Sequence, residues 1–393
     1  MKQFFVFALT GASIAILDLV DSAFGNTINI DSICVMSAFT IIYWFICVIC
    51  QIGEYAYNVK LKNETECFIL EMIATVLCSI LIIIFRNQIS HIYNLTENQY
   101  RLFSLCLLYK GILLVPAKIQ SFFYSYIEIN CKNKNIVIAN VLFYTTMILF
   151  DAIVILNHGE CYHLIIATGL ADIVTIVYFF IFCRFKAIKP KLKILFECFK
   201  CAKDILVDRI LGKIATVTFN ILASHLGTEL YALHSVGYGI ATSIEAITNS
   251  CYTNQIVKLS SINNIKEKYQ KSRSISKQVY IPTVIISYIV AMIMVLPMHG
   301  DLSLPQTFFI TILYNSQCLL IQLYENHRGF LTSCGATKCL RFGGLVGIIV
   351  RIPIAVISAV IPFGILGFAL GSGIDFLIRG LYYRSKSLKL INQ

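Results

Sequence analysis

The chain has 393 residues, of which 58% are hydrophobic and 13% are charged. Soluble domains carry about 25% charged residues, so this composition indicates a polytopic membrane protein and leaves almost no sequence for a soluble domain. The formal net charge of +11 does not indicate nucleic-acid binding, because the basic residues gather in the loops on one side of the predicted membrane helices.

Hydropathy predicts about twelve membrane-spanning helices, since a helix needs roughly 20 apolar residues to cross the hydrocarbon core. We therefore expect an all-α integral membrane protein. We expect the N-terminal apolar run to be the first span rather than a signal peptide, because no small-residue cleavage site follows it. The expected spans are residues 4–24, 32–58, 67–86, 101–130, 136–156, 161–183, 205–225, 230–256, 278–297, 304–334, 342–361 and 364–383.

Lysine and arginine are distributed unequally between the two sets of loops. One set carries most of them, whereas the opposite loops carry only Arg86 and Arg101. Positive residues favour the cytoplasmic side of a membrane. We therefore expect a multi-pass protein of the cell membrane with both termini in the cytoplasm and an even number of helices.

The sequence repeats weakly, with a period close to half its length. Ser22-Ala23-Phe24-Gly25 returns as Ser224-His225-Leu226-Gly227, and Cys183-Arg184-Phe185-Lys186 matches Tyr383-Arg384-Ser385-Lys386. Each repeat holds six expected spans, so both halves start on the same side of the membrane. We expect two six-helix bundles related by a pseudo-two-fold axis along the membrane normal. The predicted parts are an N-lobe at 1–186, a cytoplasmic linker at 187–203 and a C-lobe at 204–393.

Several short motifs occur in the order and spacing of one family of transporters. They are Val20-Asp21-Ser22-Ala23-Phe24-Gly25, Leu226-Gly227-Thr228, Arg328-Gly329-Phe330-Leu331 and Gly335-Ala336-Thr337. Together they resemble the multidrug and toxic-compound extrusion (MATE) family, within the wider multidrug/oligosaccharidyl-lipid/polysaccharide exporter superfamily. The resemblance covers the whole chain. It implies a transporter that works by alternating access and is driven by a cation gradient.

Acidic residues in the predicted N-lobe are the candidates for ion coupling. Asp18 and Asp21 lie three residues apart on the first span, where an ionised carboxylate costs roughly 2.5–3.5 kcal/mol at mid-depth. The resemblance adds Asp151 and Thr168, which match the family's N-lobe cation pocket, although Met147 stands where the family usually has an asparagine. We expect Asp21 and Asp151 to bind H⁺ or Na⁺, with Thr168 as an oxygen ligand. Alternatively, Asp18 and Asp21 only mark the end of the helix.

Polar and aromatic residues in other spans of the first half are candidates for lining a substrate cavity. Gln51 and Glu54 lie about one helical turn apart on the second span, and Tyr124 belongs to an aromatic run suited to planar cations. The alternatives are a cytoplasmic helix end for Gln51 and Glu54, and an interfacial aromatic belt for Tyr124. We expect Lys118, on the fourth span, to pair with an acid on a neighbouring helix.

Two acids of the second half are further cavity candidates. Glu245 and Glu325 lie within the eighth and tenth spans, where either would attract a cationic substrate. The alternative is that they form ion pairs with Arg328 or Arg351. The sequence does not separate the two interpretations.

These features favour a cation-coupled exporter of small amphipathic or cationic compounds. A flippase for lipid-linked oligosaccharides or polysaccharides is the alternative, and it predicts a cavity rich in Lys and Arg. The intramembrane cations Lys110, Lys118 and Arg351 are few, which counts against it. A transport-dead receptor or assembly protein is a third hypothesis.

An enzyme is not expected, because the sequence contains no nucleophile elbow, metal-binding motif or phosphate-binding loop. No cofactor is expected apart from H⁺ or Na⁺ as the coupling ion. The expected partners are a small-molecule substrate and the lipid bilayer, with no nucleic acid, and the chain is expected to be a monomer.

Overall fold

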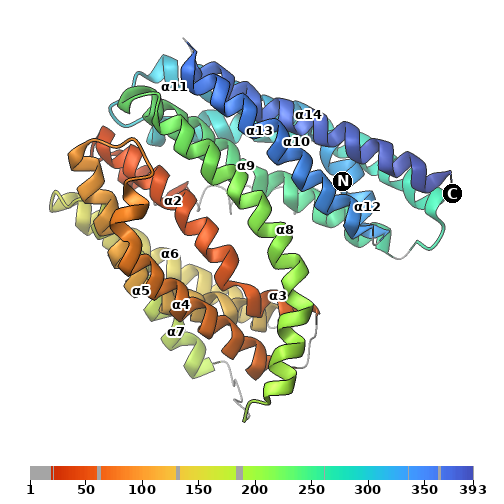
Figure 1. Ribbon diagram of the computed structural model, residues 1–393, viewed down its shortest axis with the longest axis horizontal. Coiled ribbons are helices and arrows are strands. Elements are labelled where there is room, and N and C mark those ends of the chain that lie inside the picture. Colours follow the sequence, from red (N-terminus) through yellow and green to blue (C-terminus); the bar gives the residue numbers. More distant parts are fainter. Residues whose placement is uncertain are drawn as a thin grey trace. The chain divides into compact units, whose positions relative to one another are not determined.

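A computed structural model describes residues 19–20, 22–59, 63–129, 133–182, 189–260, 262–334, 336–361 and 364–392. Within these ranges the regular structure is entirely helical (Figure 1). The helices are α2 (Ile30–Cys50), α3 (Ile52–Val59), α4 (Glu64–Ser90), α5 (Glu97–Ile129), α6 (Asn133–Leu156), α7 (Cys161–Phe182), α8 (Leu192–Ser224), α9 (Thr228–Ser260), α10 (Ile265–Met298), α11 (Leu304–Tyr314), α12 (Ile321–Ser333), α13 (Thr337–Val360) and α14 (Gly364–Ile391), with a 3₁₀ helix, η1, at Asn315–Leu320.

Eight of the described helices are long and apolar enough to cross a membrane, namely α2, α4, α5, α6, α7, α10, α13 and α14. This confirms the prediction of an all-helical, multi-pass membrane protein. The number of twelve spans, the two six-helix bundles and the symmetry between them stay predictions, as do the cell membrane and the orientation of the termini.

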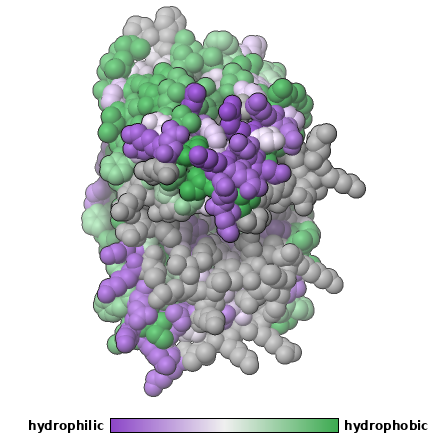
Figure 2. Space-filling model, turned by 90° about the vertical axis from the view of Figure 1, so that its right-hand side faces the viewer, coloured by the Kyte–Doolittle hydropathy of each residue, from purple (hydrophilic) through white to green (hydrophobic). Residues whose placement is uncertain are grey.

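The outer faces of the spanning helices are apolar. On α10, Ile281, Ile285, Ile289 and Ile293 follow one another at four-residue intervals, and each is more than half exposed. Residues spaced by four lie on one face of a helix. On the face shown in Figure 2, hydrophobic residues gather over the upper part, and hydrophilic residues cluster below them. Contiguous exposed apolar faces of this kind are rare on soluble monomers and suit contact with lipid tails.

The described residues form two compact units. We call Val35–Val217 the first-half unit, and Thr218–Gln393 with the described residues up to Cys34 the second-half unit. The predicted lobe boundaries at 1–186 and 204–393 stay a prediction. Residues 192–203, inside the predicted linker, form the first turns of α8.

Helix α5 lies at the centre of the first-half unit, where it packs against α4 and α7 (Figure 1). Its aromatic run turns inward: Phe122 and Phe123 are buried, and the Phe123 ring lies 5.8 Å from that of Phe179 on α7. Tyr124 is half-buried and meets the Phe179 ring edge-on at 5.1 Å. Aromatic pairs at these distances contribute to packing beyond their buried area. This part of the run therefore belongs to the core between α5 and α7.

The second-half unit is built around α14, which packs along α13 and against α12. The span predicted at residues 304–334 is interrupted here, because α11 and α12 are joined by η1 at Asn315–Leu320. A 3₁₀ segment inside a longer helix leaves its backbone less regularly bonded and often marks a functional position. Asn315 and Gln317 in η1 are buried, so this irregular segment faces the interior.

Candidate functional site

The residues predicted to hold the coupling cation are described only in part. Asp18 and Asp21 lie outside the described residues. Asp151 is fully buried on α6, and Thr168 lies on α7, which packs against α6. The Thr168 hydroxyl donates to the carbonyl of Leu164 one turn back, at 3.0 Å. Its hydrogen is therefore used within the helix, and only its lone pairs remain for a cation. The shared cation site stays a prediction.

Three charged side chains meet in the interior of the first-half unit. We call Glu54 on α3, Glu71 on α4 and Lys118 on α5 the buried charged cluster; their exposures are 8%, 0% and 3%. A Glu71 carboxylate oxygen, Oε2, accepts a hydrogen bond from the backbone N–H of Glu54 at 2.8 Å. The Ser121 hydroxyl donates to Oε1 of Glu54. Lys118 interacts electrostatically with both carboxylates. The sequence predicts one acidic partner for Lys118, and the structure places two acids, Glu54 and Glu71, near it.

A glycine permits this arrangement. A Cβ atom added at Gly53 would lie 2.2 Å from the carbonyl oxygen of Cys67 and 2.6 Å from the Glu71 Cβ atom. These are contacts with the backbone and the base of a side chain of α4, and neither can swing away. Only glycine lets α3 approach α4 so closely. The close approach brings the next residue, Glu54, within hydrogen-bonding distance of Glu71.

A second set of buried charges lies between α5, α2 and α7. The Lys110 Nζ atom is 4.4 Å from the centre of the Tyr43 ring, a cation–π distance. Asp172 on α7 is 3% exposed and interacts electrostatically with Lys110 and Lys118. Among the described residues, the interior of the first-half unit is therefore acidic on balance, because five buried acids outnumber two buried lysines: Glu54, Glu66, Glu71, Asp151 and Asp172 against Lys110 and Lys118.

The second-half unit holds a different charge arrangement around Asp375 on α14. Arg379 donates from Nε to Oδ1 of Asp375 at 2.7 Å and pairs through Nη2 with Oδ2. Arg351 on α13 places its Nε atom 3.4 Å from Oδ2 of the same carboxylate. The Asp375 side chain is 0% exposed, whereas 11% of the Arg351 and 16% of the Arg379 side chain remain exposed. Two guanidinium groups thus share one carboxylate and keep some contact with the outside.

Hydrogen bonds connect this pair of arginines to the 3₁₀ helix. Arg351 donates from Nη2 to the Ser372 hydroxyl at 3.5 Å, and this hydroxyl donates to Oε1 of Gln317 at 2.6 Å. The Gln317 amide in turn donates to the Ala241 carbonyl at 3.3 Å. On the other side, Arg379 donates to the Tyr324 hydroxyl at 2.9 Å. The irregular segment between α11 and α12 is thereby fixed to α9 and α14, and the guanidinium groups are held in place.

The remaining cavity candidates have structural partners. Glu325 is 8% exposed and accepts a hydrogen bond from Arg328 at 3.3 Å, and it also interacts electrostatically with Glu245 on α9. Gln51 is half-buried and accepts from the Tyr55 hydroxyl at 3.3 Å. Whether any of these residues contacts a substrate stays a prediction.

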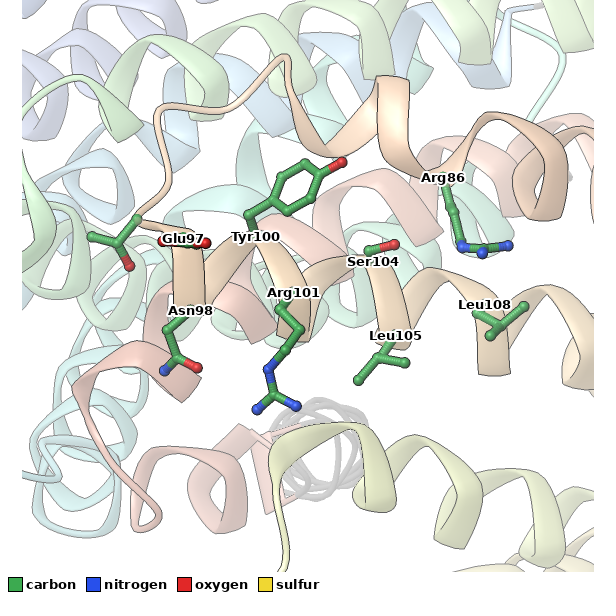
Figure 3. A pocket seen from close by; sticks show the side chains of 9 residues that line it. Arg86, Glu97, Asn98, Tyr100, Arg101, Ser104, Leu105 and Leu108 are labelled. Atoms are coloured by element: carbon green, nitrogen blue, oxygen red, sulfur yellow. The ribbon is translucent and has the colours of Figure 1, made fainter.

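An open pocket of about 840 Å³ lies where α4 ends and α5 begins (Figure 3). Its lining includes Arg86 and Arg101, the two basic residues that the sequence places on the less positive side. Arg101 forms an ion pair of 2.5 Å with Glu160, and Arg86 donates to the carbonyl of Ile83. In the adjoining loop, burial raises the pKa of the Tyr93 phenol, which therefore stays neutral.

Two loops far apart in the sequence meet in the second-half unit. Asn26 is buried, and its side-chain amide donates to the Met298 carbonyl at 2.8 Å. Gly300 has a positive φ of 53°, and a Cβ atom there would lie 2.3 Å from the Asn26 carbonyl oxygen. Both loops are predicted on the side of the membrane away from the cytoplasm. The hydrogen bond and the close backbone approach therefore hold these two loops together.

We expect Asn26→Ala to destabilise the protein by about 1–3 kcal/mol, because the Met298 carbonyl would stay buried without its donor. Thermal aggregation of the detergent-solubilised protein measures this loss. Thr27→Ala is the matched control, since the exposed Thr27 hydroxyl bonds only within its own turn. Equal melting of the two variants would show that the contact is not formed.

Sequence reasoning missed Glu71. Its signal was present, because an acid inside the apolar span predicted at residues 67–86 is costly unless it has a role. Asp375 and Arg379 lie four residues apart on the last span and are candidates for inter-helix pairs from the sequence. The pairing of Arg351 with the same carboxylate was missed, because a contact between α13 and α14 leaves no local pattern in the sequence.

Comparisons with known proteins agree on the fold. A family model described as "Polysaccharide biosynthesis protein" matches residues 34–304, more than half of the chain. No curated protein gives a significant match. A multidrug resistance MATE transporter of the multidrug/oligosaccharidyl-lipid/polysaccharide (MOP) superfamily, in an inward-facing conformation, is similar with a TM-score of 0.76 and 13% identity over 98% of this chain and 99% of that one.

Two further solved structures are similar in fold. The lipid II flippase MurJ, in an inward closed conformation, is similar with a TM-score of 0.77 and 14% identity over 98% of this chain and 87% of that one. A MOP superfamily transporter from Pyrococcus furiosus, described as having a binding pocket of reverse polarity, has a TM-score of 0.62 and 14% identity over 99% and 95% of the two chains. Because that family model matches residues 34–304, more than half of the sequence, the chain belongs to the polysaccharide biosynthesis protein family.

Proposed function

We propose that the chain is a membrane transporter that moves a lipid-linked saccharide carrying a phosphate or pyrophosphate group across the bilayer. The family to which it belongs supports this class of cargo. The observation that carries the proposal is the pair of guanidinium groups that share the single carboxylate of Asp375. The sequence alone favours amphipathic cations as the cargo. The guanidinium pair leads us to propose the alternative cargo, a lipid-linked saccharide.

The charges around Asp375 suit an anion. One carboxylate compensates one guanidinium, so Arg351 and Arg379 together carry one positive charge more than Asp375 balances. Glu245 acts electrostatically on Arg351 and Glu325 on Arg379, but the ion pairs of these two arginines are formed with Asp375. Guanidinium groups bind phosphate oxygens in a planar, two-pronged geometry that an ammonium group cannot reproduce. Both side chains keep a small exposed fraction, which gives a headgroup access. Arg379 is the cation that sequence reasoning did not count among the intramembrane basic residues.

Export of small cations is the second candidate function. The acidic interior of the first-half unit favours it, because the buried acids there outnumber the buried lysines among the described residues. In our proposal the same acids serve ion coupling instead, with H⁺ or Na⁺ as the driving ion. The cargo would then bind to the arginines of the second-half unit, and the coupling ion to the acids of the first-half unit. Transport of this kind requires no chemical change of the cargo.

Reconstitution into vesicles tests the cargo. We expect a fluorescent polyprenyl-pyrophosphate saccharide in the inner leaflet to reach a membrane-impermeant quencher faster in vesicles with the protein than in protein-free vesicles. Arg351→Lys keeps the charge but loses the planar fork, so we expect flipping to slow by about tenfold, which corresponds to about 1.4 kcal/mol.

Arg101→Lys is the matched control, because Arg101 pairs with Glu160 at an exposed position. It should flip the lipid at the wild-type rate. Wild-type flipping by Arg351→Lys would remove the guanidinium pair from cargo recognition, and no flipping by the wild type would reject this cargo.

A further inference from the structure

We propose that Glu71 is a proton-binding residue of the transport cycle, and that Glu54 and Lys118 set its two charge states. This site is separate from the predicted cation pocket at Asp21 and Asp151. This inference rests on the proposed function in one respect: both assume that a proton can drive transport.

The charges of the cluster do not balance when every group is ionised. Glu54 and Glu71 supply two negative charges against the one positive charge of Lys118, and all three side chains are at least nine-tenths buried. An uncompensated charge in such surroundings is very costly, so the group takes up a proton instead. One proton on the two carboxyl groups makes the cluster neutral.

The hydrogen bonds favour Glu71 as the group that holds this proton. The Glu54 carboxylate accepts from the Ser121 hydroxyl, and a serine hydroxyl is a good partner for an ionised oxygen. Glu71 accepts one backbone N–H at Oε2, but its Oε1 atom is buried without a hydrogen-bond partner among the described residues. An ionised carboxylate would leave that oxygen charged and unsolvated. A neutral carboxyl group at Glu71 avoids this cost.

A second unpartnered group lies one turn further along α4. Thr75 is fully buried, and its hydroxyl oxygen also lacks a hydrogen-bond partner among the described residues. Residues four apart face the same side of a helix. Glu71 and Thr75 therefore leave two polar groups unsatisfied on one face of α4, which is the arrangement expected where a proton or a water molecule exchanges.

The groups around Glu71 come from every element packed against it. Glu54 and Tyr55 lie on α3, Cys67 lies on α4 itself, and Lys118 lies on α5. Arg209 on α8 acts on Tyr55 from an exposed position. Lys118 is the only buried positive charge in this set, so loss of the Glu71 proton increases the negative charge facing it.

The position of Glu71 offers a short route for the proton. Glu71 lies seven residues after the start of α4, roughly 10 Å along the helix axis. That end of α4 is predicted to be cytoplasmic. On release, the Glu71 carboxyl group becomes a carboxylate and its proton passes to cytoplasmic water. The new negative charge strengthens the attraction between α4 and Lys118 on α5.

Infrared spectroscopy of the full-length protein in lipid vesicles tests the protonation directly. We expect a carbonyl-stretching band of a protonated carboxyl group that disappears as the pH rises. In Glu71→Gln this band should be lost while the melting temperature stays unchanged, because glutamine resembles the neutral acid. Glu97→Gln is the control, since Glu97 lies at the exposed start of α5 and should leave the band in place.

Two more variants separate a proton site from a structural ion pair. In Glu54→Gln, Lys118 needs the charge of Glu71, so the Glu71 band should disappear. In Lys118→Met, both acids should be protonated, so the band should roughly double. A band that persists in Glu71→Gln would overturn the proposal, as would a marked loss of stability in Glu71→Gln, which would show an ionised Glu71 paired with Lys118.

These readouts do not depend on the cargo. If the protein fails to flip a lipid-linked saccharide but the infrared titration behaves as described, the proposed cargo is wrong and the proton site stands. If flipping occurs and the band is absent at every pH, the proton site is wrong and the cargo stands.

Discussion

The Asp375→Asn protein is expected to lose about 3–5 kcal/mol of stability, because the substitution leaves two partly buried guanidinium groups without their shared, fully buried carboxylate. Asp375 is fully buried, and both Arg351 and Arg379 form ion pairs with its carboxylate. Removing one partner of a buried ion pair costs far more than the pair contributes when intact. The temperature at which the detergent-solubilised protein aggregates measures the loss.

A double variant provides the control. Asp375→Asn combined with Arg351→Met removes one negative and one positive charge together, so we expect it to recover much of the lost stability. Coupling between the two substitutions of about 0.5–3 kcal/mol would show that the groups interact. Additive effects, or an Asp375→Asn protein that melts like the wild type, would contradict the shared use of this carboxylate.

Gly53→Ala is expected to separate α3 from α4 and to destabilise the protein by about 1–3 kcal/mol, because the added methyl group would overlap the Cys67 carbonyl. The Cβ atom would lie 2.2 Å from that oxygen, so the helices themselves must move. The movement would also break the 2.8 Å bond between the Glu54 backbone and Glu71. Thermal aggregation measures the stability, and the infrared band of Glu71 reports the cluster.

Gly212→Ala is the matched control for this substitution. Gly212 also lies inside a helix, on α8, but a Cβ atom there would meet nothing within 4 Å. Replacing a helical glycine with alanine at such a position normally stabilises the helix by roughly 0.5–1 kcal/mol. If Gly53→Ala were as well tolerated as Gly212→Ala, the close approach of α3 to α4 would be wrong.

The sequence predicts the class of the protein better than its helix limits. Composition and hydropathy are enough to establish a multi-pass, all-helical membrane protein, because the bilayer imposes helix length and polarity on each span. The interruption of the span at 304–334 by η1 carries no such signal. The start of α8 at Leu192 also has no clear signal in the sequence. Residues 192–203 mix basic and apolar residues in a pattern that suits either a linker or a helix.

The candidate site could be predicted only where a residue was unusual by itself. Glu54 and Lys118 stood out because a charge within an apolar span is costly, and the pairing of Lys118 with acids follows from the same reasoning. The identity of the acids near Lys118 depends on the contact of α3 with α4 at Gly53, and no pattern in the sequence predicts that contact. The pairing of Arg351 with Asp375 is hidden for the same reason.

The class of cargo is the claim that a single measurement tests most directly. Vesicles containing equal amounts of the protein are offered a polyprenyl-pyrophosphate saccharide, the same saccharide on an uncharged polyprenyl carrier, and a cationic dye. We predict protein-dependent translocation of the pyrophosphate-linked saccharide only. Translocation of the cationic dye without movement of the pyrophosphate-linked saccharide would contradict the proposed function.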